Sequence, residues 1–196
     1  MEPVRDSSLI LELNGACGKN SPATSTWKDL SGHDNDGTLS GFGYVAGSGW
    51  SGDGLEFDGV NDYVDCGNKA IFDFTGEFTL EFIMFHKNLA STWEWFMAKN
   101  SNSSASEGYY VGYYADGHTI AFYANSKHVD SGLVPQANTM YHIFAVYKPS
   151  QYLKLVVNGT TYTNTEAIPA SILPNLTHSL TIGRTMYYAS TFIKTI

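Results

Sequence analysis

The chain has 196 residues, with 19 acidic and 11 basic side chains that give a formal net charge of −8 at pH 7. This balance leaves no basic stripe for phosphates, so we expect no nucleic-acid partner and no adhesion to anionic membranes. Charged residues are only 15% of the chain and hydrophobic residues 43%, a mixture typical of one folded domain with polar, uncharged outer surfaces. No apolar run approaches the ~20 residues of a membrane-spanning helix, so we expect no membrane insertion.

The N-terminal segment and the cysteines bear on where the protein works. Residues 1–6 lack the basic-then-apolar pattern of a signal peptide. We therefore expect the chain either to be exported without such a signal, for example inside a virion, or to be a piece of a larger protein. Cys17 and Cys66 are the only cysteines, and they do not make a disulfide framework. The sequence favours two free, partly buried thiols over one bridge between them.

The longest apolar run, residues 78–85, has the alternation of a β-strand. Phe78, Leu80, Phe82 and Met84 occupy every second position, which predicts a strand with one face in the core. Similar runs of aromatic and β-branched residues recur along the chain, separated by Gly, Asn, Asp, Ser or Pro. We expect these further strands at residues 8–13, 38–39, 96–98, 109–113, 119–123, 141–147, 153–157 and 179–183.

Turn signals complete the prediction of the fold class. Asp116-Gly117 and Asn158-Gly159 are two-residue sequences typical of tight hairpins. Helix signals are few, and only residues 168–173 are compatible with a turn or two of helix. Many short strands with Gly-rich turns and no alternating helices predict an all-β sandwich or jelly roll.

Residues 54–66 contain a cluster of turn formers between two short apolar runs. Two extended runs joined by a short polar turn predict a hairpin. The turn residues Asp58, Asn61 and Asp62 have two interpretations. Either their side chains only serve the local backbone, or their oxygens face a ligand or a Ca²⁺ ion, which prefers oxygen ligands. A second and weaker oxygen cluster is Asp34, Asn35 and Asp36.

Six segments in a fixed order carry a family resemblance. They resemble the laminin-G-like, concanavalin-A-like lectin domains of bacterial surface proteins, secreted glycosidases and phage tail proteins. The resemblance extends over roughly residues 8–195 and implies a single all-β domain, a two-sheet antiparallel jelly roll whose termini come together. The segments are residues 27–39, which read Trp-Lys-Asp-Leu-Ser-Gly and then Asn-Asp-Gly-Thr-Leu, and residues 55–64, 78–82, 141–146, 153–159 and 180–184.

The resemblance also implies a role and a setting. Such domains commonly bind glycans or protein partners without catalysis, outside the cell, on its surface or in a phage tail, and many hold calcium. They usually continue into a further strand after Phe192, so we expect residues 1–196 to be a single domain cut from a larger protein, without its closing strand. An unpaired sheet edge promotes association, so subunit contacts in a larger assembly are expected as well.

Aromatic residues in loops and strands are the candidate glycan site. Glycan sites place an aromatic face against a sugar ring and surround it with polar groups. The alternative is that such aromatic residues pack at the edges of the core. The candidates are Trp93 and Trp95 after the long strand, Tyr113 in the next strand, and Arg184 and Tyr187 in a late loop.

The sequence does not indicate an enzyme. Retaining glucanases of this fold need two carboxylates about 5–5.5 Å apart. Glu77 and Glu81 have suitable spacing, but Thr79 stands where an acid is wanted between them. No nucleophile, P-loop or zinc motif is present, and His142 is expected to pack in a core strand. We therefore expect a non-catalytic recognition module; the alternatives are a structural virion or surface domain without a glycan ligand and, less favoured, a glycoside hydrolase.

Overall fold

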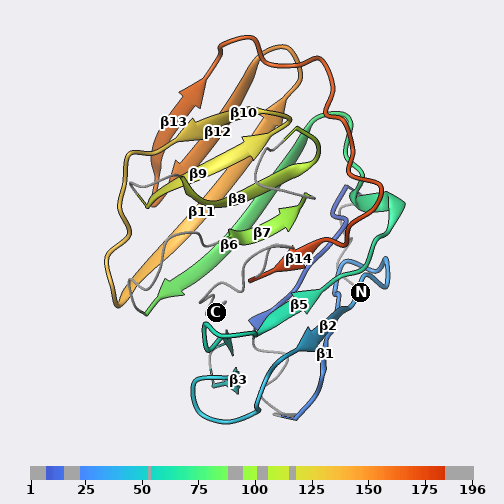
Figure 1. The fold of residues 1–196 in the computed structure, drawn as a ribbon, viewed down its shortest axis with the longest axis vertical. Helices are drawn as coiled ribbons and strands as arrows, with labels where there is room; N and C mark the ends of the chain where they lie inside the picture. Colours follow the sequence, from blue (N-terminus) through green and yellow to red (C-terminus); the bar gives the residue numbers. More distant parts are fainter. Residues whose placement is uncertain are drawn as a thin grey trace, which may run out of the picture.

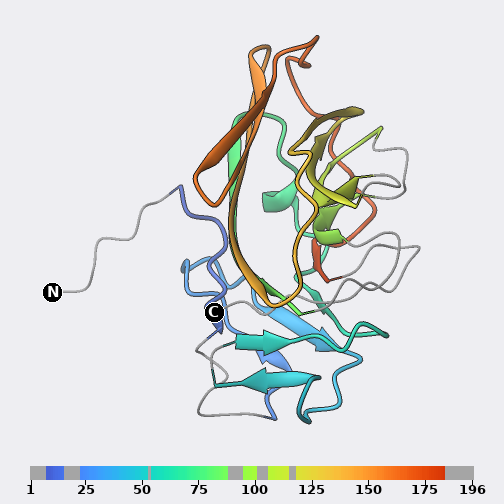
Figure 2. The same ribbon diagram turned by 90° about the vertical axis from the view of Figure 1, so that its left-hand side faces the viewer.

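A computed structural model of the chain describes residues 8–15, 23–52, 54–87, 95–100, 106–114 and 118–183. Its strands form two facing antiparallel layers with the core between them (Figures 1 and 2). This architecture confirms the predicted two-sheet antiparallel sandwich. The larger sheet has the order β1 (Thr26–Trp27), β2 (Gly37–Ser40), β5 (Tyr63–Asp65), β14 (Thr181–Ile182), β7 (Trp95–Lys99), β8 (Tyr109–Tyr114), β9 (Thr119–Ala124) and β10 (Lys127–Asp130). The smaller sheet has the order β13 (Thr160–Asn164), β12 (Tyr152–Val157), β11 (Thr139–Lys148) and β6 (Phe78–His86), and β3 (Gly49–Ser51) pairs with β4 (Gly54–Glu56) in a separate ribbon.

The central pair of the smaller sheet, β6 and β11, confirms the predicted alternation. Phe78, Leu80, Phe82 and Met84 all point into the core and are at most 8% exposed. The positions between them face the other side of the sheet, as a period of two requires. Strand β11 pairs with β6 on one side and β12 on the other, so its inward residues are buried between both sheets.

The predicted hairpin at Asn158-Gly159 is confirmed. These residues join β12 to β13 with φ angles of 48° and 83°, the two positive values that a type I′ turn requires. Asp116-Gly117 lie outside the described residues, but the strands that flank them, β8 and β9, do pair as expected.

The predicted hairpin within residues 54–66 is wrong. Strand β4 pairs with β3, whereas β5 pairs with β2 and β14 in the larger sheet. The physical reason lies in the turn between them. The Asp62 carboxylate points inward and accepts hydrogen bonds from the Ser48 hydroxyl and the Asp58 N–H group. These bonds close the turn on the β3–β4 ribbon, and the chain then continues into the larger sheet as β5.

Two further expectations for local structure are also wrong. Residues 8–13 form no strand, apart from a single bridge from Leu13 to Asp29, because the carbonyl of Ile10 accepts side-chain hydrogen bonds from Ser31 and Asn35 instead of a neighbouring strand. Residues 168–173 are not helical. Residues Ala70–Phe72 form a 3₁₀ turn, and in the described part of the chain no helix is long and apolar enough to cross a membrane.

Cys66 is a free and buried thiol. Burial raises its pKa to about 12, so the thiol is protonated and unreactive at neutral pH. Cys17 lies outside the described residues. The structure therefore places Cys66 as a small core residue, as the sequence favoured.

Candidate functional site

A row of stacked aromatic rings crosses the outer face of the larger sheet from β7 to β10. Alternation within β8 and β9 places Tyr110 and Tyr123 on the face opposite to the core. The ring centroid of Tyr110 lies 3.8 Å from that of Trp95 and 4.3 Å from that of Tyr123, and Tyr123 lies 4.9 Å from His128. All three contacts are close to parallel. We call these four side chains the aromatic row.

Strand register explains why the aromatic row forms. Tyr110 pairs directly with Tyr123, and Tyr123 pairs directly with His128, so the spacing between strands sets the spacing of the rings. The row is unevenly covered: Trp95 and Tyr110 are each 4% exposed, whereas Tyr123 and His128 are half-buried. The rings near the β10 edge are therefore the more accessible part of the row.

The five predicted ligand-binding residues have different positions. Trp95 belongs to the aromatic row, where its ring lies against Tyr110. Tyr113 points into the core, is 3% exposed, and hydrogen-bonds through its hydroxyl to Nε2 of His86 at 2.5 Å. Trp93, Arg184 and Tyr187 lie outside the described residues. The described segments next to them do meet, since the N–H group of Gly183 donates to the carbonyl of Phe96 in β7.

The predicted calcium ligands are mostly engaged with the protein itself. Asp62 is 2% exposed; its Oδ2 accepts from the Ser48 hydroxyl at 2.8 Å and from the Asp58 N–H group at 2.9 Å. Asp58 Oδ1 accepts from the N–H groups of Val60 and Asn61. Oδ1 of Asp62 is buried and has no hydrogen-bond partner. Burial raises the pKa of this carboxyl group, although the Ser48 hydrogen bond opposes the shift.

This donor set does not fit a complete calcium site. Calcium takes six to eight oxygens, and the turn offers one buried carboxylate oxygen that is not already bonded to a donor. Within the described ranges there is no group of three or more His, Cys, Asp or Glu side chains placed to hold a metal ion. At the second predicted cluster, lysine side chains occupy the oxygens. Nζ of Lys69 donates to the Asp34 carbonyl and to Asn35 Oδ1, and Lys28 pairs with Asp36.

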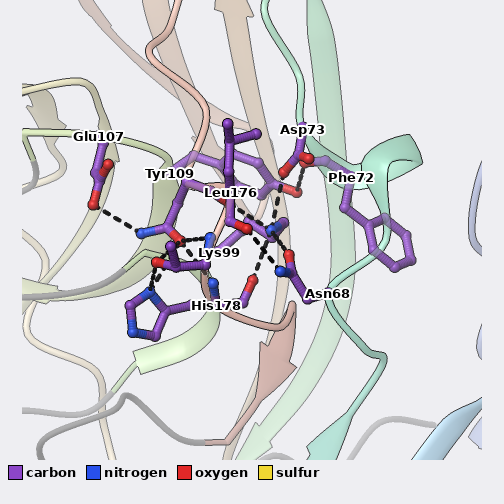
Figure 3. Close-up of polar contacts among 10 residues, drawn as sticks. Asn68, Phe72, Asp73, Lys99, Glu107, Tyr109, Leu176 and His178 are labelled. Carbon is purple, nitrogen blue, oxygen red and sulfur yellow. Dashed lines mark hydrogen bonds and ion pairs between the residues drawn. The ribbon is translucent and has the colours of Figure 1, made fainter.

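A fully buried lysine, Lys99, organises the end of the larger sheet (Figure 3). Its ammonium group donates to Asn68 Oδ1 at 2.8 Å and to the carbonyls of Asn175 and His178 at 2.7 and 2.6 Å. It also lies 3.0 Å from Oδ1 of Asp73. These oxygens come from two loops that are distant in sequence, so the ammonium group joins both loops to β7.

Neighbouring hydrogen bonds extend this cluster. Asn175 is buried; its Oδ1 accepts from the N–H groups of Thr177 and His178, and its Nδ2 donates to Glu107. The hydroxyl of Tyr109 donates to the Phe72 carbonyl at 3.1 Å. Burial, reinforced by the nearby Asp73 charge, holds the pKa of Tyr109 well above its usual value. The cluster is a rigid support for loops rather than a place where a ligand can enter.

Glu77 and Glu81, the two acids considered for a glucanase site, lie at the outer face of the smaller sheet. The side chains of Glu77 and Glu81 are both 56% exposed and each contacts a different nitrogen, Nζ of Lys148 for Glu77 and Nε2 of His142 for Glu81. His142 is not packed in the core as expected, because even-numbered positions of β11 face outward; its Nε2 lies 2.7 Å from Glu81 Oε1. Two exposed and separately paired carboxylates lack the enclosure that raises the pKa of a glycosidase acid.

Comparison with known sequences gives the family of the chain. Residues 58–193 match the laminin-G family model described as the concanavalin A-like lectin/glucanases superfamily. This match covers more than half of the chain, so the chain belongs to that superfamily, and its sandwich is the corresponding jelly roll. A search of curated proteins finds no match.

Three solved structures share this fold. Domain 4 of AbnA, an extracellular GH43 arabinanase from Geobacillus stearothermophilus, in complex with arabinotriose, is 10% identical, with a TM-score of 0.54 over 95% of this chain and 90% of that one. The binding domain of botulinum neurotoxin serotype D is 14% identical, with a TM-score of 0.53 over 96% of this chain and 46% of that one. The enzymatically active domain of tailspike protein 2 from bacteriophage CBA120 is 18% identical, with a TM-score of 0.51 over 81% and 26%. This chain thus spans about a quarter of the tailspike's enzymatically active domain and about half of the toxin domain, and the likeness is one of fold.

Proposed function

We propose that this chain is a non-catalytic recognition module that binds a glycan of a cell surface through the outer face of its larger sheet. The aromatic row is the observation that carries the proposal. The core of the sandwich does not need large rings on this face, whereas a sugar ring packs its apolar side against such rings. Tyr123 and His128, the accessible end of the row, are the proposed contact residues.

Three predicted residues outside the described ranges extend the proposed site. Trp93 stands two residues before Trp95 of the aromatic row in the sequence, and Arg184 follows Gly183, whose N–H group is bonded to β7. We propose Trp93, Arg184 and Tyr187 as additional ligand contacts because of these positions in the sequence. An arginine at such a site supplies hydrogen-bond donors in a fixed planar arrangement.

The solved structures that share this fold support a binding role. One structural relative was solved with arabinotriose, and another is a toxin binding domain. The tailspike relative places this fold in a phage tail protein. A position outside the cell or on a virion, as part of a larger protein, is the setting that we propose.

A glycan array and binding to bacterial cell-wall fractions test the proposal. Tyr123→Ala and His128→Ala should each weaken binding about tenfold or more, since each removes a stacking ring. Tyr152→Ala is the matched control, because Tyr152 lies on the smaller sheet with Lys154 over its ring. Binding to no glycan, or equal affinity in all three variants, would contradict the proposal.

A structural role in an assembly is the second candidate, and one observation favours it. Among the described strands, β6 pairs only with β11, so this nine-residue strand is the outer strand of its sheet. Outer strands of this length are sites of strand pairing between subunits. Light scattering distinguishes the two roles, because a stable oligomer without affinity for any glycan indicates assembly.

A further inference from the structure

Tyr44, in the loop between β2 and β3, has an unfavourable backbone conformation. Its φ angle is 53°, in the left-handed region, which bulky side chains rarely adopt. Most other non-glycine residues with positive φ in the structure are Asn, Asp or Ser, which tolerate this region in turns. An aromatic residue kept in such a conformation is a reason to look for a function at that place.

The surrounding contacts hold this conformation firmly. Val45 and Ser48 exchange two backbone hydrogen bonds of 3.0 Å, and the Ser48 hydroxyl accepts from the Gly43 N–H group at 2.8 Å. Gly49 packs against Tyr44 so closely that a Cβ atom at Gly49 would lie 2.9 Å from the Tyr44 Cα atom. The loop is therefore preorganised, and binding there requires little further ordering.

The loop presents an aromatic ring beside polar groups of the neighbouring turn. Tyr44 is 37% exposed, and Asn61 is exposed beside Gly41, the residue at the start of the loop. Among the described residues no hydrogen bond is made by the Tyr44 hydroxyl or by the Asn61 side-chain amide. Asp58 is half-buried in the same turn. The loop and the neighbouring turn thus carry a ring, an amide and a carboxylate.

Electrostatics at this loop favour a positive group. In the described part of the chain neither Asp58 nor Asp62 has an ion-pair partner, and Oδ1 of Asp62 is buried without a hydrogen-bond partner. The third carboxylate nearby, Glu56, is neutralised by Lys87 at 2.9 Å. Asp62 adjoins the loop that carries Tyr44, because the Ser48 hydroxyl accepts from the Gly43 N–H group and donates to Oδ2 of Asp62. The Asp62 charge is, after burial, the second cause that raises the pKa of the Tyr44 hydroxyl. A buried carboxylate oxygen without a donor, next to a loop that carries an exposed aromatic ring, suits a cation.

We propose that Tyr44, with Asp58 and Asp62, forms a second binding site, which takes the ammonium group of an amino sugar. The ammonium group lies over the Tyr44 ring in the field of the two carboxylates, and Asn61 hydrogen-bonds the sugar hydroxyls. One organic cation needs far fewer oxygen contacts than calcium, and the buried Asp62 oxygen acts on it through its charge rather than by direct contact. The sugar part of this inference rests on the proposed glycan recognition, but its residues are distinct: β3 lies at the lower end of the molecule in Figure 1, and β9 and β10 at the upper end.

The charge of the ligand is tested with two probes that differ in one group. D-glucosamine and N-acetylglucosamine, at pH 6.5 and low salt, are titrated into the ¹⁵N-labelled chain while the amide signals of residues 43–49 and 58–62 are followed. Glucosamine should shift these signals with an affinity about tenfold or more above that of N-acetylglucosamine, which lacks the positive charge. Equal affinities, or shifts confined to β9 and β10, would overturn the proposal. Calcium chloride is the third probe, and calcium binding without any glucosamine binding would also overturn it.

Substitutions at Tyr44 separate binding from stability. Tyr44→Asn removes the ring but tolerates the left-handed conformation, so it should abolish glucosamine binding while the melting temperature stays equal or rises. Tyr44→Phe should retain binding, since the ring remains. Tyr152→Asn, on the smaller sheet, is the matched control. If Tyr44→Asn binds glucosamine like the wild type, the site is elsewhere. Tyr44→Asn leaves the aromatic row intact. The test of this second site can therefore fail while the test of the aromatic row with the Tyr123 and His128 variants succeeds, and the reverse.

Discussion

The ammonium group of Lys99 lies 3.0 Å from Oδ1 of Asp73, and the lysine is fully buried. A buried charge of this kind is tolerated only where partners replace water. Three further oxygens at 2.6 to 2.8 Å complete its surroundings. The ammonium group therefore holds the two loops together through their oxygens, as a bound metal ion can.

Removal of this ammonium group should be costly. Lys99→Met keeps an apolar stem of similar length but leaves Asp73 and the carbonyls of Asn175 and His178 without their donor. Breaking one side of a buried ion pair costs about 3–5 kcal/mol of unfolding free energy, and urea denaturation measures the loss. Lys69→Met is the control: its ammonium group is less buried, so we expect a loss below about 1 kcal/mol. Similar losses in both variants would show that the Lys99 cluster is not the main support.

The pair of His86 and Tyr113 should make stability depend on pH. Burial lowers the pKa of His86, and the influence of the Gln136 backbone only partly opposes the shift. The unfolded chain then binds a proton below about pH 6.5 that the folded chain does not, so the free energy of unfolding is constant above that pH and falls as the pH drops below it. Urea midpoints at pH 7.5 and 5.5 measure this loss. His86→Gln should reduce it, and an unchanged loss in this variant would contradict the assignment to His86.

How far the sequence could predict this structure depends on which interactions fix each element. The alternation of β6 predicts its burial because one face of a strand must meet the core. Strands β10 and β13 escape prediction, because both are polar and are stabilised by their partners in the sheet more than by burial. The hairpin prediction at 54–66 failed because a side chain, Asp62, redirects the turn, and periodicity contains no information about side-chain hydrogen bonds.

The candidate site was predicted less completely than the fold. Trp95 was singled out, but its stacking partners Tyr110, Tyr123 and His128 depend on the register of four strands, which the sequence does not specify. Lys99 had only a weak signal, a lysine at the end of the apolar run Trp-Phe-Met-Ala. Tyr44 had none, because a positive φ angle at an aromatic residue follows from its surroundings.

Asp62 should also affect stability with pH, in the opposite direction to His86. Burial raises the pKa of its carboxyl group in the folded chain, so folded protein holds a proton that unfolded protein loses above about pH 3.9. Its contribution to the free energy of unfolding is therefore largest at low pH and declines as the pH rises through the folded pKa. Asp62→Asn should remove this decline, as followed by urea midpoints between pH 3.5 and 7. Ser48→Ala, which removes a hydrogen bond that lowers this pKa, should steepen it; a flat response in that variant would contradict the assignment.

Gly108 offers a test of how tightly the Lys99 cluster is packed. Its φ angle is 69°, and a Cβ atom there would collide with the carbonyl oxygen of Lys99. Its N–H group also donates to the Leu173 carbonyl at 2.7 Å, so the backbone cannot move away without losing that bond. Gly159 has a similar φ of 83°, but a Cβ atom there would meet no other described atom within 4 Å, so this glycine isolates the cost of the dihedral angle alone.

Gly108→Ala should therefore destabilise the chain much more than Gly159→Ala. We expect about 1 kcal/mol for Gly159→Ala from the left-handed conformation, and at least about 2 kcal/mol more for Gly108→Ala from the collision. Chemical denaturation of both variants measures the difference. Hydrogen exchange adds a local readout, because Gly108→Ala should increase exchange at the backbone amides of Thr177 and His178, whereas Gly159→Ala should not. Equal effects of the two substitutions would mean that the loop carrying Gly108 yields easily and that the Lys99 cluster is not rigid.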